Sequence, residues 1–191
     1  MPSITAKPLP EVELLICCAR AHMDDASAER LAALLDNPLD WELVIRLAEA
    51  HKIVPVVSHH LGGAVHAVPA VDRLRERARG IAQTNLARTA ELLRVVARLE
   101  ANGITATPMK GPALAASAYG SLALRAFDDL DLLIDAKDVT RAQALLAEDG
   151  YRARVAVAPE QEAMLLRVAR EVLLFDAGRD ILIELQWRLV E

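Results

Sequence analysis

The sequence predicts an α+β protein, with a helical first part followed by a mixed α/β part. Three observations indicate this class. The composition favours helix, because Ala and Leu have high helix propensity, and apolar residues of the first part recur at helical spacing. Strand-like runs begin only after Asn102-Gly103. The predicted regions are therefore a helical N-terminal region, residues 1–103, and a mixed β-sheet flanked by helices, residues 104–191.

The first region is predicted to be a series of helices joined by short connections. Asp40 is well placed to cap one of them, because an Asp side chain accepts a hydrogen bond from the backbone at a helix start. The segment after that helix contains Pro55 and is predicted as a short, interrupted apolar piece. The helices are predicted at residues 11–22, 27–37, 41–51 and 69–100.

The longest predicted helix, residues 69–100, carries an apolar stripe that should face a core. Its Arg-rich opposite side is interpreted as a solvated face, with attraction of phosphates as the alternative. The stripe is predicted to contain Val71, Leu74, Ala78, Ile81, Leu86, Leu93 and Val96.

The second region alternates predicted strands and helices. Its strands are expected at residues 104–109, 129–134 and 151–157, followed by a hairpin over residues 171–187 that turns at Ala177-Gly178-Arg179. Its helices are expected at residues 111–119, 139–148 and 159–169.

Composition and charge restrict the function. The formal net charge is -5, which argues against nucleic acid as a partner, because such surfaces are usually basic. No uncharged apolar stretch approaches the about 18 residues of a membrane-spanning helix, and residues 1–10 lack the apolar core of a signal peptide. We therefore expect a cytoplasmic protein without a membrane partner, in which Cys17 and Cys18 are buried, reduced thiols.

Carboxylates interrupt two of the apolar strands. In the run DLDLLI, Asp129 and Asp131 are two residues apart and face the same side of a strand. Glu184, in DILIELQ, is a third acid between apolar neighbours. Such acids are costly to bury unless a cation joins them, and Mg²⁺ prefers oxygen ligands. A strand cap or a solvated edge is the alternative, and it suits Asp128 better than the other two aspartates.

A lysine and a glycine lie about 20 residues before these acids, between a strand and a helix. Backbone N–H groups at a helix start bind phosphate, and glycine lets a phosphate approach the backbone closely. Lys110 and Gly111 are therefore candidates for a phosphate-binding turn.

The stretch MKGPALAASAYGSLALRAFDDLDLLID resembles the signature of the bacterial family usually called "nucleotidyltransferase family protein", of the DNA polymerase β-type nucleotidyltransferase superfamily. Members read roughly Lys-Gly-x-Ala-Leu-Ala, then a tyrosine, an arginine and Asp-Ile-Asp-Leu-Leu-Val. The similarity extends over nearly the whole chain, through LAEAHKIVPVVSHHL, EDGY and IELQWRLV. The corresponding residues are Lys110, Gly111, Ala113, Leu114, Ala115, Tyr119, Arg125, Asp129 and Asp131.

The resemblance implies a magnesium-dependent nucleotidyltransferase. Asp129 and Asp131 would hold two Mg²⁺ ions, with Glu184 completing one shell, and these three acids form the catalytic set. Lys110 and the amide of Gly111 would bind the β- and γ-phosphates of a nucleoside triphosphate. The acceptor, a small molecule, peptide or protein, is left unidentified.

Two further residues keep two interpretations each. Arg125 would neutralise phosphate charge or pair with Asp128, and Tyr119 would pack in the fold or stack on a base.

The alternative function is a non-catalytic module of the same fold, which binds a nucleotide or a protein. Gln186 supports it, because relatives tend to carry a histidine there and glutamine cannot transfer a proton. The sequence also stops at Glu191, whereas family members usually continue with a further helical portion, so a shortened copy is expected.

Overall fold

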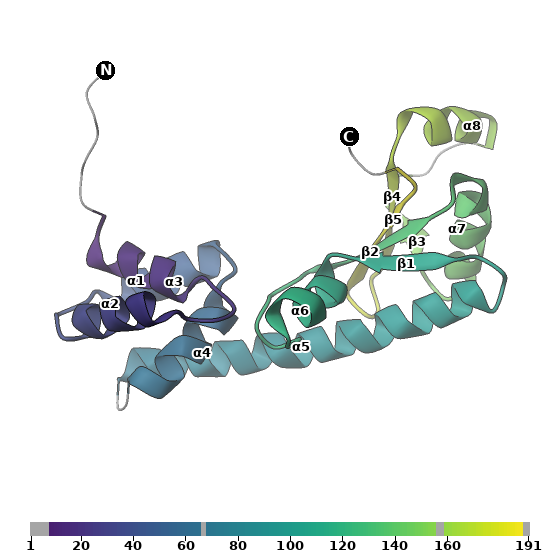
Figure 1. Cartoon of the computed structure of the whole chain (residues 1–191). Helices are drawn as coiled ribbons and strands as arrows, with labels where there is room; N and C mark the ends of the chain where they lie inside the picture. The colour runs from purple at the N-terminus through teal and green to yellow at the C-terminus, as the bar shows by residue number, and fades with distance from the viewer. Residues whose placement is uncertain (1–7, 66–67, 156–158, 189–191) are drawn as a thin grey trace, which may run out of the picture. The chain divides into compact units, whose positions relative to one another are not determined.

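The α+β class predicted from the sequence is confirmed by the computed structural model, in which helices precede and flank a mixed sheet (Figure 1). The structure describes residues 8–65, 68–155 and 159–188.

The chain forms two compact units. The first comprises residues 1–84 and 118–126, and the second comprises residues 85–117 and 127–191. The long helix α5 (Pro69–Glu100) therefore contributes its N-terminal half to the first unit and its C-terminal half to the second.

The first unit is built from helices, two of which start at a capping aspartate. Asp24 accepts a hydrogen bond from the amide of Ser27 at 2.7 Å, and Asp40 accepts one from the amide of Leu43 at 3.0 Å. The predicted cap at Asp40 is thus confirmed. Besides the start of α5, the helices are α1 (Pro10–Cys18), α2 (Asp25–Leu35), α3 (Trp41–Ala50) and α4 (Val54–Ala64).

The core of the first unit is aliphatic and includes both cysteines. Cys17 and Cys18 are buried and free, as predicted. Burial raises the pKa of the Cys18 thiol to about 12, so this group is neutral and unreactive at physiological pH. The fully buried side chains around them include Leu14, Val44, Val57, Leu61 and Leu74.

Helix α4 differs from the sequence prediction of an interrupted apolar piece. Pro55 lies in the first turn of α4, where a missing backbone N–H costs no helical hydrogen bond. The helix then continues through Gly62 and Gly63, because the buried face that includes Val57 and Leu61 packs into the core. Tertiary packing therefore overrides the local signals for a break.

The second unit contains a five-stranded sheet in the order β1-β2-β5-β4-β3. Only β2 and β5 pair in parallel, and the other neighbours are antiparallel. The strands are β1 (Ala106–Met109), β2 (Asp129–Ile134), β3 (Arg152–Ala153), β4 (Glu171–Asp176) and β5 (Ile181–Gln186). The helical elements are the rest of α5, α6 (Gly111–Tyr119), the short 3-10 helix η1 (Ala136–Asp138), α7 (Val139–Glu148) and α8 (Pro159–Val168). The strand predicted at residues 151–157 is shorter in the structure, and its residues 156–157 lie outside the described part.

One face of this sheet packs against helices, and the other, which we call the open face, carries several partly exposed side chains. Alternate residues of the two parallel strands, among them Leu130, Leu132 and Ile183, are fully buried. They pack in a core with apolar side chains of α5 and α7, two helices drawn close to the sheet in Figure 1. The residues between them point to the opposite, open face, because strand side chains alternate. That face carries the predicted acids.

The apolar stripe predicted for α5 is wrong at Leu86 and Leu93, whereas Val96 packs against the core as predicted. Leu86 and Leu93 are exposed, at 60% and 64%, whereas Leu92 is buried. The buried positions keep the helical period through Asn85, which is fully buried although polar, and Leu92 resumes the apolar stripe. A stripe traced through apolar letters alone therefore drifts off the true face at Asn85.

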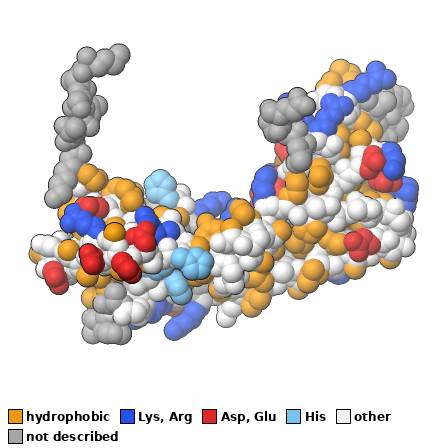
Figure 2. All heavy atoms as spheres, viewed as in Figure 1, with side chains coloured by type: hydrophobic (Ala, Val, Ile, Leu, Met, Phe, Trp, Pro, Cys, Tyr) orange, Lys and Arg blue, Asp and Glu red, His pale blue; other side chains and the backbone are white. Residues whose placement is uncertain are grey.

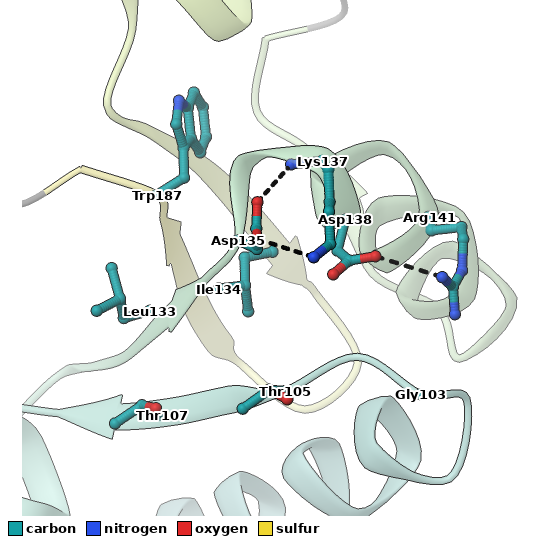
Figure 3. Close-up of a pocket in the computed structure, with 10 residues that line it drawn as sticks. All are labelled: Gly103, Thr105, Thr107, Leu133, Ile134, Asp135, Lys137, Asp138, Arg141 and Trp187. Atoms are coloured by element: carbon teal, nitrogen blue, oxygen red, sulfur yellow. Dashed lines mark hydrogen bonds and ion pairs between the residues drawn. The ribbon is translucent and has the colours of Figure 1, made fainter.

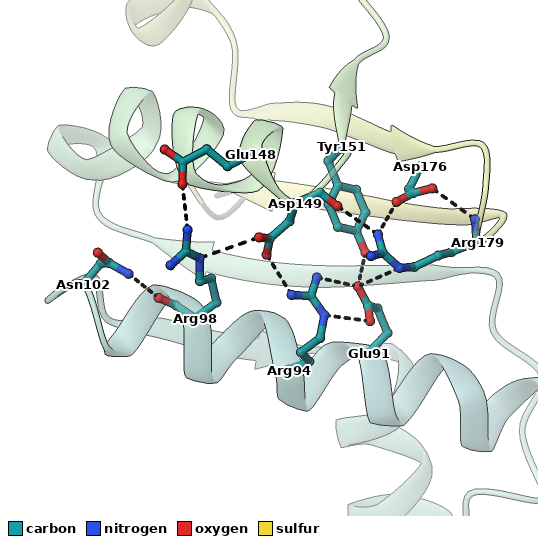
Figure 4. A network of polar contacts seen from close by, with 9 residues as sticks. All are labelled: Glu91, Arg94, Arg98, Asn102, Glu148, Asp149, Tyr151, Asp176 and Arg179. Carbon is teal, nitrogen blue, oxygen red and sulfur yellow. Dashed lines mark hydrogen bonds and ion pairs between the residues drawn. The ribbon is translucent and has the colours of Figure 1, made fainter.

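A network of ionised side chains ties α5 to the rest of the second unit (Figure 4). Glu91 of α5 accepts hydrogen bonds from Arg94 at 2.7 and 2.9 Å and from the hydroxyl of buried Tyr151 at 2.7 Å. Arg94 also donates to Asp149 at 2.7 Å, and Arg179 lies 4.0 Å from Glu91. Each buried charge in this group thus faces an opposite one.

Two expectations from the sequence concern nucleic acid and a membrane as partners. In the view of Figure 2 neither unit presents a face of Lys and Arg alone, since acidic side chains lie among the basic ones. No helix within the described ranges is both long and apolar enough to cross a membrane.

Candidate active site

In the turn between β1 and α6, the backbone passes close to the backbone of β2. Lys110 and Gly111 both have positive φ, 41° and 32°. A Cβ atom on Gly111 would lie 3.3 Å from the backbone oxygen of Asp129, tighter than most such contacts. Helix α6 begins directly at Gly111, and the amide of Leu114 donates to the oxygen of Lys110 at 2.8 Å. A non-glycine residue held in this conformation is strained, and such strain is common at functional sites.

The acids lie on the open face of the two parallel strands. Asp129 and Asp131 are alternate residues of β2, and Asp131 is paired in register with Glu184 of β5. Residues 53 positions apart in the sequence therefore lie side by side, and we call Asp129, Asp131 and Glu184 the acid row. Met109, the last residue of β1, pairs with Asp131 from the other side and places the Lys110-Gly111 turn next to the row.

Asp131 is the centre of the row and is only partly satisfied. Its Oδ1 accepts from the ammonium of Lys110 at 2.7 Å and from the amide of Gln186 at 2.9 Å. Its Oδ2 is buried and has no hydrogen-bond partner in the described part of the chain. The whole residue is 2% exposed, so water does not compensate freely for the missing contact.

The carboxylates repel one another. Burial, together with the charges of Asp131, Asp129 and Glu171, raises the pKa of Glu184. The hydrogen bond to Asp131 raises the pKa of Lys110, and the charges of the acid row add to that effect. Lys110 is thus held as a cation among excess negative charge, a balance that favours a further cation at this place.

The residues suit a hard divalent cation. The unpartnered Oδ2 of Asp131 and the neighbouring carboxylates of Asp129 and Glu184 are oxygen ligands of the kind that Mg²⁺ binds. As the side chains stand, no three His, Cys, Asp or Glu groups among the described residues are close enough to form a ligand set. Lys110 contacts Oδ1, and its side chain is 58% exposed on a flexible stem, so solvent can accommodate the ammonium when it leaves the carboxylate.

The remaining predicted residues lie around the strand start. Asp128 is exposed and pairs with Arg88 at 3.4 Å, and Arg88 also donates to the backbone oxygen of Phe127 at 2.6 Å. Asp128 thus helps to fix the chain where it enters β2. Arg125 and Tyr119 are half-buried and belong to the first unit, so their roles toward phosphate and base stay predictions.

Two members of the site were missed by sequence reasoning. Gln186, considered only as a lost proton carrier, bridges two acids: its amide donates to Asp131 and also to Glu184 at 3.2 Å. Glu171 of β4 pairs in register with Gln186 and adds negative charge beside Glu184. The signal for Gln186 was its spacing, two residues after Glu184 on the same strand face.

The Lys110-Gly111 turn, the two aspartates of β2 and the glutamate of its parallel neighbour β5 lie together, as the resemblance to nucleotidyltransferases implies. The chain belongs to the family described as "Uncharacterised nucleotidyltransferase", whose sequence pattern matches residues 37–191. No curated protein and no solved structure matches the chain. The family membership confirms the predicted resemblance and supports nucleotidyl transfer in general.

Proposed function

We propose that this protein is a magnesium-dependent enzyme that transfers a nucleotide from a nucleoside triphosphate to an acceptor hydroxyl. The observation that carries the proposal is the buried, unpartnered Oδ2 of Asp131 between two further carboxylates. A structural role alone would favour a partner for that oxygen, because an orphaned buried acceptor costs about 1–3 kcal/mol.

Bound Mg²⁺ would neutralise the acid row and stabilise the attacking and leaving oxygens. Asp129, Asp131 and Glu184 would hold it. Lys110, released from Asp131, would reach the β- and γ-phosphates, which the backbone of Gly111 lets approach closely.

The transfer breaks one phosphoanhydride bond. The acceptor oxygen bonds to the α-phosphorus, the bond from that phosphorus to the bridging oxygen breaks, and pyrophosphate leaves toward Lys110 and Gly111. Among the three acids of the row, Glu184 is best suited to take the hydroxyl proton, since its pKa is raised by burial and by its acidic neighbours. Gln186 would keep Asp131 and Glu184 in place through its two hydrogen bonds.

The test is isothermal titration with α,β-methylene-ATP, whose α–β linkage resists this cleavage, with and without Mg²⁺. Wild type should bind only with Mg²⁺, and Asp129→Asn/Asp131→Asn should abolish that binding. Asp128→Asn is the matched control: it removes an adjacent carboxylate that lies outside the acid row, so binding should persist. Binding without Mg²⁺, or binding that survives the double substitution, contradicts the proposal.

The second candidate is a binding module without turnover. It is favoured by the contacts of Lys110 and Gln186, which together already occupy Oδ1 of Asp131. Incubation with radiolabelled ATP and a cell lysate separates the two functions. Label transferred to an acceptor by wild type and not by the double variant establishes an enzyme, whereas metal-dependent binding without transfer establishes the module.

A further inference from the structure

A cavity of about 540 Å³ lies in the second unit, and Figure 3 shows the residues that line it. This volume is within the about 300–1,000 Å³ typical of small-molecule sites. Thr107 of β1 and Thr105, just before that strand, line one side of it. Leu133 of β2 and Trp187, the residue after β5, also line it. The remaining wall includes two ion pairs at the start of α7, Asp135 with Lys137 and Asp138 with Arg141.

The register of the sheet places this cavity at one end of the acid row. Leu133 lies two residues beyond Asp131 on the same face of β2, a distance of about 7 Å along the strand. Thr107 pairs with Leu133 as Met109 pairs with Asp131. The phosphate turn follows Met109 and contacts Asp129, at the other end of the row. Along β2 the order is therefore phosphate turn, acid row, cavity.

In-line displacement requires the attacking oxygen to approach opposite the leaving group. Pyrophosphate held at Lys110 and Gly111 would leave at the Asp129 end, so the acceptor must arrive from the Leu133 end. We propose that the cavity lined by Thr107, Leu133 and Trp187 binds the acceptor, and that the acceptor is an uncharged, polyhydroxylated small molecule such as a sugar. This inference rests on the proposed nucleotidyl transfer.

The chemistry of the lining selects this class. The two cations and two carboxylates balance, so a charged ligand gains no net attraction from the wall. In the metal-free protein, an anionic ligand would in addition be repelled by the acid row next to the cavity. The exposed hydroxyls of Thr105 and Thr107 donate and accept hydrogen bonds, as the hydroxyls of a sugar do.

The wall can also adapt at low cost. The side chains of Lys137 and Asp135 are 74% and 56% exposed, and an ion pair so exposed contributes little stability. Both groups can therefore turn to a ligand hydroxyl. The indole N–H of Trp187 donates to the backbone oxygen of Leu166 at 3.2 Å, so this apolar wall is fixed in orientation. A ring lying on Leu133, which shares its face of β2 with Asp131, would extend a hydroxyl toward Asp131.

Binding is tested without nucleotide by saturation-transfer NMR on the full chain. The probes are the methyl glycosides of glucose, galactose and mannose, N-acetylglucosamine and myo-inositol, with glucose 6-phosphate as the anionic comparison. At least one neutral probe should bind, and glucose 6-phosphate should bind at least about tenfold more weakly. Thr105→Val/Thr107→Val should weaken the neutral probe at least about fivefold, from the loss of two hydroxyl partners.

Thr140→Val is the matched control, because Thr140 is exposed in the same unit and lies outside the cavity lining. It should leave probe binding unchanged, and circular dichroism should show that all variants are folded. The inference is overturned if no neutral probe binds, if the phosphorylated probe binds as tightly, or if the threonine double variant binds like wild type. Because no nucleotide or metal is present, these outcomes do not depend on whether nucleotidyl transfer occurs.

Discussion

The second unit contains two clusters of ionised side chains that are satisfied very differently. Around Glu91, the carboxylates of α5, α7 and the β4–β5 hairpin each meet an arginine (Figure 4). In the acid row a single lysine and one amide contact Asp131, and one buried oxygen has no partner within the described residues. The two clusters belong to the same unit and share the same sheet.

The difference separates structural charge from functional charge. In the structural cluster each carboxylate meets an arginine, because a buried charge without an opposite charge lowers the free energy of unfolding. In the acid row, three carboxylates share one lysine, so a further cation would balance the remaining negative charge. Burial raises the pKa of Glu91, yet its hydrogen bonds from Arg94 and Tyr151 outweigh that effect and lower the pKa overall, whereas the pKa of Glu184 is raised.

The largest expected effect concerns activity. Asp131→Asn removes the central charge of the acid row, and we expect nucleotide transfer to fall by about 10³-fold, the scale of losing one main electrostatic contact in a transition state. Its thermal midpoint should not fall, because the change removes repulsion between carboxylates and keeps the side-chain shape. Transfer of labelled nucleotide measures the activity, and a thermal melt measures the midpoint. A variant that melts at a lower temperature yet keeps its activity would show that Asp131 has a structural and not a functional role.

The next effect concerns stability. Glu91→Gln leaves Arg94 and Arg179 facing a neutral group in a place where Glu91 is 9% exposed. We expect the free energy of unfolding to fall by about 2–4 kcal/mol. This is below the about 3–5 kcal/mol for breaking a fully buried pair, because the side chains of Arg94 and Arg179 are 40% and 43% exposed. Urea denaturation measures it. A loss below about 1 kcal/mol would show that the network is not the structural counterpart of the acid row.

A smaller effect is expected in how the stability loss of Glu91→Gln depends on pH. Since the pKa of Glu91 is lowered on folding, its contribution is fully present above the unfolded pKa of about 4.3 and is lost as pH falls through the folded pKa. The difference in unfolding free energy between wild type and Glu91→Gln should therefore be constant from about pH 6 to 8 and shrink below about pH 4. Urea titrations at these pH values test the trend, and a difference that grows on acidification excludes it.

The smallest effect is expected at the rim of the network. Glu148 pairs with Arg98 at 2.7 Å, but its side chain is 66% exposed. Glu148→Gln should change the free energy of unfolding by less than about 1 kcal/mol, as is usual for exposed pairs. This variant is also the control for Glu91→Gln, since both replace a glutamate that faces an arginine. Equal losses in the two variants would mean that burial does not distinguish the contacts.

Much of the acid row could be predicted because strand periodicity is a local property. Asp129 and Asp131 are two residues apart, which alone puts them on one face, and Leu130 and Leu132 confirm it by being fully buried. The parallel pairing that brings Glu184 beside Asp131 is not local, and its register followed only from the structure. The resemblance to a family supplied that link in advance.

Other features were beyond local rules. Fully buried Asn85 keeps the helical phase of α5 although it is polar, so hydrophobicity misplaced Leu86 and Leu93. Pro55 reads as a break in sequence but is harmless in the first turn of α4. Lys110 contacts Asp131 although the two residues are 21 positions apart, and no sequence rule predicts which acid of the row the lysine contacts.

The strand order β1-β2-β5-β4-β3 has a consequence for synthesis of the protein. Strand β5 lies in the middle of the sheet although it follows every other strand in sequence. During translation, β2 and β4 would each expose an unpaired edge until residues 181–186 leave the ribosome, and exposed edges invite aggregation. The third acid of the row arrives in the same step. The protein can therefore complete its site only when β5 has paired with β2 and β4. Nascent chains that lack β5 would carry two of the three acids but no complete row.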